Sequence, residues 1–381
     1  MQENVTIHNF GPIKEAQIEL RDLTVFVGPL ASGKSLAAQV LYFLRGIEEL
    51  MPPDTEDPVA TTLAALELWL GYDPSLLITE STTLTWQNQK MQWLGNSMSL
   101  NQTLEQRIRT WWKSGTSPLK QIYIPAGRIL YSFVPPFAAP QLQLLFSRSR
   151  AKSQALPGYI STFYAVLGSV LEALWHDQEV RKHGQKSFSD TLDEIQSFRT
   201  KARAITKGDL HYGPGTISLE IGKKIFQSSA ISAGQMEIWP FLAITESILS
   251  FSTSPFKYMY FEEPEAHLHP GAQRQVMEIV AQLVRQNVKC VITTHSPYIL
   301  YVINNFLMTQ KVLDKERSLP CQALEATALA QHQVAAYRFS PDGYVSDIMD
   351  SETGLIDEEE LDRVADDLGS TFSDLQDALE D

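Results

Sequence analysis

Two kinds of hydrophobic pattern open the chain. Apolar and polar residues alternate over residues 5–10 and 16–20, on either side of a Gly-Pro turn, and this period of two predicts two strands with one covered face. The apolar run over residues 23–28 ends in glycine and predicts a strand buried on both faces, with a helix following over residues 35–45. The chain therefore begins as the entry to a core of strands and helices.

Apolar strands and helices alternate again in the second half of the chain. The expected strands lie within residues 121–128, 216–221, 257–261 and 288–294, and the expected helices within residues 228–250 and 270–286. Continuous apolar strands that alternate with helices are typical of a sheet covered on both faces. We therefore expect an α/β fold, with a mixed or parallel sheet flanked by helices.

Helical periodicity without strand signals runs through residues 160–205, whereas residues 51–120 are less regular. The expected organisation has four parts. They are an N-terminal part of the core (1–136), an inserted helical lobe (137–210), a C-terminal part of the core (211–340) and an acidic C-terminal segment (341–381).

Composition adds limits on environment. The chain is 44% hydrophobic and has two cysteines among 381 residues, so a disulfide scaffold is excluded and a reducing compartment is favoured. Acidic residues interrupt the most apolar windows, and no secretory signal pattern opens the sequence. We expect a cytoplasmic protein with no membrane partner.

The charge is concentrated at one end. Residues 341–381 carry 15 acidic side chains against Arg363, which accounts for the whole net charge of −14. The first 340 residues are neutral, with 30 basic and 30 acidic side chains. An acidic end disfavours nucleic acid there but does not exclude a basic stripe elsewhere.

The clearest chemical motif is GPLASGKS over residues 28–35, which fits G-x-x-x-x-G-K-[ST] between a predicted strand and a predicted helix. Such a loop curls so that its backbone N–H groups face phosphate oxygens. Lys34 would reach the β- and γ-phosphates, and Ser35 would ligate Mg²⁺. The other residues predicted to bind nucleotide here are Gly28, Ser32, Gly33 and Leu36. The alternative is a chance glycine-rich turn.

Two carboxylates follow the apolar strand KYMYF. Glu262 is predicted to hold the metal, and Glu263 to orient or deprotonate the attacking water. Neighbouring side chains at a strand end point in opposite directions, so the roles of the two should differ. Taken alone, the pair would be read as a solvated loop.

Two further segments complete the set. His295 follows the apolar strand 288–294 and could donate to a γ-phosphate. The segment SSAISAGQ places Ser232, Gly234 and Gln235 at the start of a helix, where N–H groups can bind an anion. Its alternative is a plain serine cap.

The order GPLASGKS, ISAGQ, MYFEEPEAHLHP and TTHS resembles the ABC-type ATPases, in which the segments correspond to Walker A, the signature, Walker B with the D-loop, and the switch histidine. HNFGPIKEAQIEL, YIPAGR and GLIDEEELDRV are further similar to the overcoming-lysogeny-defect and Septu-type phage-defence ATPases, relatives of the SMC ATPases. The resemblance implies ATP and Mg²⁺ as ligands and Glu263, His295 and Lys34 as catalytic residues. It also implies an ATP-dependent homodimer in which Walker A faces Ser232 of the second copy.

The sequence departs from the family pattern in several places. The signature reads ISAGQ instead of LSGGQ, Glu262 replaces an aspartate, and His269 replaces the D-loop aspartate. Four glutamines are candidates for the Q-loop: Gln87, Gln89, Gln92 and Gln121. Arg128 could lie near the site or form a structural salt bridge. His267 and His269 form an H-x-H pair, for which zinc binding is a minor alternative.

The family relationship suggests an ATPase switch that controls a separate nuclease or toxin, in antiphage defence. Relatives of the overcoming-lysogeny-defect type carry a Toprim nuclease domain after the switch histidine. Only 86 residues follow His295 here, and they contain no acidic motif in the Toprim order, so no intrinsic nuclease is predicted. The alternative function is an SMC-style ATPase that acts directly on nucleic acid. Its predicted DNA contacts are Arg148, Arg150, Lys152, Arg181, Lys182 and Lys186. A transporter subunit is a third, weaker reading.

Overall fold

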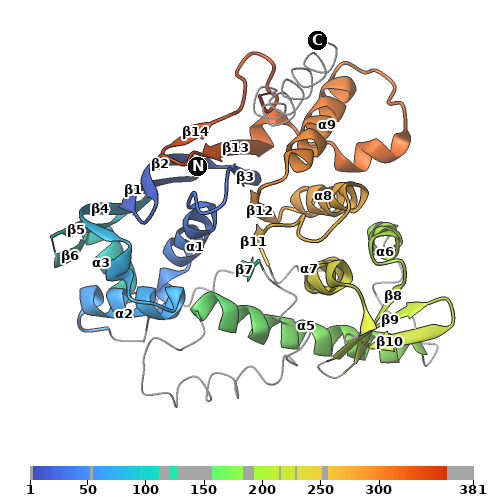
Figure 1. Cartoon of the computed structure of the whole chain (residues 1–381), viewed down its shortest axis with the longest axis horizontal. Helices are drawn as coiled ribbons and strands as arrows, with labels where there is room; N and C mark the ends of the chain where they lie inside the picture. Colours follow the sequence, from blue (N-terminus) through green and yellow to red (C-terminus); the bar gives the residue numbers. More distant parts are fainter. Residues whose placement is uncertain are drawn as a thin grey trace, which may run out of the picture.

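The computed structural model describes residues 3–51, 55–95, 97–110, 121–126, 157–182, 193–213, 216–227, 230–250 and 256–357. Within them, a central six-stranded sheet is accompanied by two antiparallel sheets and flanked by two groups of helices (Figure 1). The basic segment 147–153, Arg128, Lys186 and the acidic residues 358–381 lie outside the described residues.

The central sheet has the strand order β14-β13-β3-β12-β11-β7. Its strands are β3 (Leu23–Val27), β7 (Gln121–Ile124), β11 (Tyr258–Glu262), β12 (Lys289–Thr294), β13 (Val334–Phe339) and β14 (Val345–Asp347). All neighbours are parallel except β14, which runs antiparallel to β13. The expected α/β fold with a largely parallel sheet is therefore confirmed.

An antiparallel sheet of order β2-β1-β4-β5-β6 stands beside the central one. It consists of β1 (Glu3–Phe10), β2 (Ile13–Leu20), β4 (Ile78–Trp86), β5 (Gln89–Leu94) and β6 (Ser97–Leu100). The third sheet is a small antiparallel one formed by β8 (Asp209–Gly213), β9 (Thr216–Ile221) and β10 (Lys224–Gln227).

The helices divide between the two faces of the central sheet. They are α1 (Lys34–Arg45), α2 (Pro58–Leu70), α3 (Gln102–Thr110), α5 (Gly158–Lys182), α6 (Asp193–Thr206), α7 (Ala233–Ser250), α8 (Pro270–Arg285) and α9 (Pro297–Asp314). Short 3₁₀ turns occur at Ile47–Leu50, Pro74–Leu76, Gln322–Thr327 and Gln331–Gln333.

Alternate residues of each central strand enter two separate hydrophobic cores. Met259 and Phe261 of β11 pack with α5 to α9, whereas Tyr260 between them packs with α1, α2 and the antiparallel sheet. This is the period of two expected of a strand buried on both faces. By the same alternation, Glu262 at the end of β11 lies on the side of α1.

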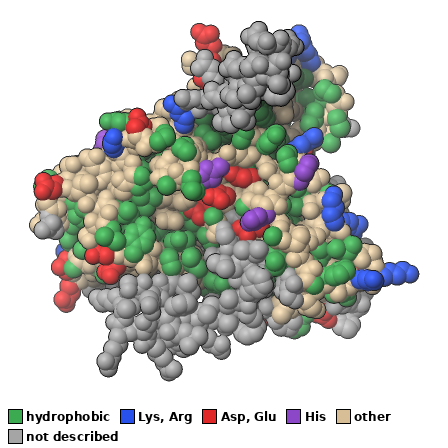
Figure 2. Space-filling view, in the orientation of Figure 1, with side chains coloured by type: hydrophobic (Ala, Val, Ile, Leu, Met, Phe, Trp, Pro, Cys, Tyr) green, Lys and Arg blue, Asp and Glu red, His purple; other side chains and the backbone are tan. Residues whose placement is uncertain are grey.

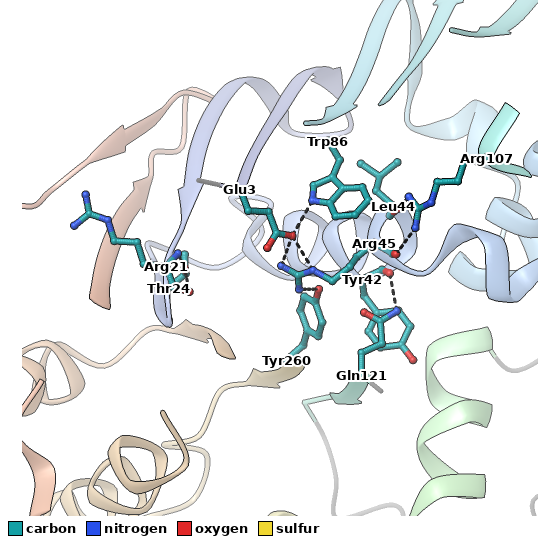
Figure 3. Close-up of polar contacts among 10 residues, drawn as sticks. All are labelled: Glu3, Arg21, Thr24, Tyr42, Leu44, Arg45, Trp86, Arg107, Gln121 and Tyr260. Atoms are coloured by element: carbon teal, nitrogen blue, oxygen red, sulfur yellow. Dashed lines mark hydrogen bonds and ion pairs between the residues drawn. The ribbon is translucent and has the colours of Figure 1, made fainter. Parts of the chain in front are cut away.

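A buried ion pair and its hydrogen bonds join α1, β1, β4 and β11 in the second of these cores (Figure 3). The Arg45 guanidinium, at the end of α1, donates from Nε and Nη2 to Glu3 Oε1 of β1 over 2.8 and 2.6 Å. The same carboxylate oxygen accepts from Trp86 Nε1 over 2.8 Å, and Arg45 Nη1 donates to the hydroxyl of Tyr260. Arg107 adds a hydrogen bond to the Arg45 carbonyl, so α1 is tied to both sheets and to α3.

The predicted strands and helices form, with several additions. The helix expected from residue 228 begins at Ala233, because the Ser232 carbonyl accepts the first helical bond from Met236 N–H. The segment 51–120 was expected to be less regular, but it contains α2, α3 and three strands. The helix α9 and the strand β13 follow the last predicted motif and were not anticipated. The four-part domain division stays a prediction.

Candidate nucleotide site

The loop between β3 and α1 requires glycine at both ends. Gly28 has a φ of 151°, and a Cβ there would overlap the Phe339 carbonyl oxygen of the neighbouring strand β13. Gly33 has a φ of 100°, and its Cβ would lie 2.6 Å from Ile13 Cγ1. Side chains rarely adopt such φ values, so glycine lets the loop curl tightly between β3 and α1. This is the conformation that a phosphate-cradling loop needs.

Lys34 is held inside this loop. Its ammonium donates to the carbonyl oxygens of Gly28 and Pro29 over 3.0 and 2.7 Å, and it lies 3.5 Å from His295 Nδ1. Burial lowers the pKa of Lys34 to about 8, although the charges of Glu263, Glu265 and Glu262 oppose this shift. The ammonium already binds oxygen atoms inside the loop, and it could exchange the two carbonyls for phosphate oxygens.

The other predicted residues of the phosphate loop are Ser32, Ser35 and Leu36. The Ser32 hydroxyl donates to the Pro29 carbonyl over 2.9 Å. Ser35 is half-buried in the first turn of α1, while the Leu36 side chain enters the core. Helix N-termini leave their first N–H groups without intrahelical partners, so these groups face the loop.

The carboxyl ends of β3, β12 and β11 lie side by side, which brings the separate motifs together. The register aligns Val27 with Thr294 and Thr293 with Glu262. Figure 2 shows acidic and histidine side chains gathered in the middle of one face, in the region where these strands end. Ligands of parallel α/β sheets bind at this edge.

Glu262 and Glu263 have different partners. Glu262 is buried, and its two oxygens accept from the Tyr123 hydroxyl over 2.6 Å and from Ala126 N–H over 2.8 Å. Burial and the nearby Glu262 charge raise the pKa of Tyr123 well above its usual value, so this hydroxyl remains a donor. Glu263 instead lies 3.4 Å from His295 Nε2, with the backbone N–H donating to the Thr293 carbonyl.

His295 thus stands between Lys34 and Glu263. Lys34 approaches its Nδ1 and Glu263 approaches its Nε2. The imidazole is about one-third exposed, as is the Glu263 carboxylate. An open carboxylate beside a histidine is an arrangement that can orient and deprotonate water.

Glu265 was not identified from the sequence. Its Oε1 accepts from the His295 N–H over 2.6 Å and from the Thr294 hydroxyl over 2.8 Å. Its spacing of two from Glu263, directly after Pro264, was the only signal, and nothing in that pattern specifies contact with a strand 30 residues later.

The signature-like segment forms a compact cap on α7. The Ser232 hydroxyl and N–H both donate to Gln235 Oε1 over 2.9 Å, and the Gln235 amide donates to the Thr206 carbonyl of α6. A Cβ on Gly234 would lie 2.6 Å from the His267 carbonyl oxygen, so α7 packs closely against the D-loop. No hydrogen bond of the described chain links Ser232 or Gln235 to the phosphate loop.

The oxygen donors present suit Mg²⁺. Ser35 and Glu262 supply a hydroxyl and a carboxylate, and Mg²⁺ is usually bound by one or two carboxylates together with substrate phosphates. Over the described ranges no group of three or more His, Cys, Asp or Glu side chains could form an all-protein metal site. His269 caps α8 by accepting from Gly271 N–H at Nδ1, and His267 is exposed with a φ of 57°.

The remaining candidates are dispersed. Gln121 donates to the Tyr42 carbonyl, Gln89 accepts from Arg107, Gln87 occupies the β4–β5 turn, and Gln92 lies in β5. Of the six predicted DNA contacts, Arg181 alone has a described side chain, and it pairs with Asp177. No helix of the described chain is long and apolar enough to cross a bilayer.

The lowered pKa of Lys34 predicts a pH-dependent affinity for ATP. Phosphate oxygens favour the charged ammonium, so above about pH 8 binding must take up a proton that the free protein has lost. Apparent affinity should be flat below this pH and fall by up to about tenfold per unit above it, measured by calorimetry from about pH 7.5 to 10.

The matched variant for this test is Lys34→Arg, because arginine stays protonated over the same range. Its affinity should not depend on pH, even if binding is weaker. An equal slope in both proteins would assign the pH dependence to another group.

Comparisons with known proteins agree with this chemistry at a coarse level. The family model described as an AAA ATPase domain matches residues 140–300, which include the signature-like segment, Glu262, Glu263 and His295. No curated protein matches the sequence.

Among solved structures, the chain is similar to three SMC heads. For an Smc head bound to the C-winged helix domain of ScpA, identity is 12%, coverage is 92% of this chain and 98% of that chain, and the TM-score is 0.49. An Smc head with an extended coiled coil, bound to the C-terminal domain of ScpA derived from Pyrococcus furiosus, is 13% identical. The match covers 96% of this chain and 99% of that chain, with a TM-score of 0.44. The SMC head domain from Thermotoga maritima is 12% identical, and the match covers 79% of this chain and 91% of that chain with a TM-score of 0.35. At these scores the likeness carries no information about activity. The domain match supports an ATPase of the P-loop type.

Proposed function

We propose that this chain binds ATP with Mg²⁺ and hydrolyses it at the edge formed by β3, β12 and β11. The observation that carries the proposal is the meeting of three side chains at that edge. His295 Nδ1 lies 3.5 Å from Lys34 Nζ, and His295 Nε2 lies 3.4 Å from Glu263 Oε1. Lysine, carboxylate and histidine come from three separate motifs, and a structural ion pair would need only two of them.

In this mechanism the protein groups have distinct tasks. Lys34 leaves the Gly28 and Pro29 carbonyls and binds the phosphate oxygens, where its charge stabilises the transition state. Glu263 orients the attacking water and accepts its proton, while His295 donates a hydrogen bond toward the transferred phosphoryl group. Bound Mg²⁺, held by Ser35 and Glu262, would neutralise phosphate charge. Tyr123 and Ala126 N–H fix the Glu262 carboxylate on the side of α1.

The active assembly in this proposal is a dimer with two shared sites. Ser232 and Gly234 lie at the N-terminus of α7, where N–H groups favour an anion, and Ser232 is exposed. Leu30, at the tip of the phosphate loop, is 83% exposed. A second copy that covered Leu30 with its own Ser232 segment would bury this apolar side chain and complete the phosphate contacts.

The output of the cycle is control of a separate effector, a nuclease or a toxin, and we place it in antiphage defence. Support comes from the resemblance of the motifs and from the site itself, since nucleotide binding and release at a shared interface alters the assembly.

ATP hydrolysis by the wild type and by Lys34→Ala tests the proposal. Loss of one charged transition-state donor should lower the rate by about 10²–10³-fold. Lys224→Ala is the matched control, because Lys224 is an exposed lysine in β10. No hydrolysis by the wild type, or equal rates in the wild type and Lys34→Ala, would contradict the assignment. Co-purification of a second protein would support the effector role, and salt-sensitive DNA binding without one would favour the SMC-style alternative.

A further inference from the structure

The D-loop and the segment that ends β12 and follows it are joined by hydrogen bonds at two separate places. The D-loop here is residues 263–269, and the switch loop is residues 294–296. At the first place, Glu265 Oε1 accepts from the Thr294 hydroxyl and from the His295 N–H. Glu265 therefore holds the backbone of the switch histidine.

The second connection runs through α8. The Ser296 hydroxyl donates to Gln273 Oε1 over 2.8 Å, and Gln273 Nε2 donates to the Leu268 carbonyl over 2.9 Å. Ser296 N–H also donates to the Thr294 hydroxyl oxygen over 3.0 Å. The bonds therefore close a ring that leaves the D-loop at Glu265 and returns to it at Leu268.

Most of this ring is out of contact with water. Thr294 is fully buried, and Gln273 and Ser296 are each 8% exposed. A buried polar group that loses its partner bears a desolvation cost, whereas a fully bonded set stiffens its surroundings. The D-loop and the switch loop should therefore move together and not independently.

The ring lies between two parts of the proposed ATPase site. On one side, the His295 imidazole lies between Lys34 and Glu263. On the other, the His267 carbonyl is so close to Gly234 of α7 that no side chain fits between them. A displacement of the signature-like segment therefore reaches the D-loop by direct contact, and the ring extends it to His295.

We propose that Glu265, Gln273 and Ser296 are positioning residues, which set the orientation of His295 according to the position of the D-loop. None of them contacts nucleotide in this scheme. The inference rests on the proposed ATPase function for its kinetic consequence, but the ring itself can be tested without nucleotide.

Amide hydrogen exchange at His295 in the full, nucleotide-free chain is that test. Glu265→Ala removes the acceptor of this N–H, so exchange should accelerate about tenfold or more. Gln273→Met breaks the ring at its far side, and a coupled ring predicts faster exchange there too. Glu265→Gln keeps an acceptor oxygen and should restore slow exchange. Gln282→Met, on the same helix but outside the ring, should leave it unchanged.

The kinetic readout separates positioning from binding. Glu265→Ala and Gln273→Met should each lower kcat by about tenfold or more while KM for ATP changes little, because misorientation affects the reaction and not substrate capture. The double variant should lose no more than the worse single variant, because both substitutions break the same device.

Two results would overturn the ring. One is a rate of amide hydrogen exchange at His295 that stays within about twofold of the wild type in Glu265→Ala or in Gln273→Met. The other is kcat losses that multiply in the double variant. If the wild type hydrolyses no ATP, the proposed function fails, and the exchange measurement still decides whether the ring exists.

Discussion

Glu263→Gln should bind ATP and fail to hydrolyse it, with a rate about 10²–10⁴-fold below the wild type. The amide retains the size of the side chain and its place beside His295 but cannot accept the proton of the attacking water. ATP therefore stays bound, and the shared-site proposal predicts that the variant remains a dimer. Solution mass with and without ATP and Mg²⁺ measures this directly.

The control for this variant is Glu80→Gln, which makes the same chemical change on an exposed part of β4. It should hydrolyse ATP and change mass as the wild type does. Unimpaired hydrolysis in Glu263→Gln would remove the role of Glu263 as base. Tight ATP binding with no change in mass would contradict the two-copy site and the role of Ser232, while leaving the Glu263 assignment intact.

Glu3→Leu should destabilise the protein by about 3–5 kcal/mol, because it leaves a buried guanidinium without its carboxylate. The Arg45 side chain is 2% exposed and Glu3 is 7% exposed, so water cannot replace the lost partner. Trp86 Nε1 loses its acceptor in the same substitution. Urea denaturation followed by tryptophan fluorescence provides the measurement.

A double-mutant cycle shows whether the loss comes from an uncompensated charge. Arg45→Met should cost a similar amount, whereas Glu3→Leu combined with Arg45→Met should cost clearly less than the sum. Arg203→Met removes the exposed pair with Asp209 and should change stability by about 1 kcal/mol or less. Additive costs across the cycle would show that the pair is not coupled.

The parts of the site that were predictable share a local signal. Gly28 and Gly33 stand between a strand and a helix, and Lys34 begins that helix. Glu262 ends the apolar strand β11, and His295 directly follows the apolar strand β12. Because parallel strands end at one edge, strand-end residues of a single sheet can be expected together. The sequence therefore predicted which of these side chains meet at the edge of the sheet.

The contacts that were not predictable join positions distant in the chain. Tyr123 holds Glu262 across 139 residues, and Arg45 meets Tyr260 across 215. Such contacts depend on the order of the strands in the sheet, and hydrophobic periodicity does not indicate which strands will be neighbours. Glu265 escaped notice for the same reason, because its partners Thr294 and His295 lie at the end of a different strand.

The position of β3 in the central sheet has a consequence for biosynthesis. The phosphate loop is encoded near the start of the chain, yet β3 pairs with β12 and β13, which include residues 289–294 and 334–339. The backbone of Gly28 lies so close to the Phe339 carbonyl, in the second of these strands, that a Cβ would overlap it. A ribosome must therefore synthesise β12 and β13 before the loop acquires its neighbours, since long-range strand pairing is late and slow. Nascent chains should therefore remain unable to capture nucleotide until β13 has emerged from the ribosome.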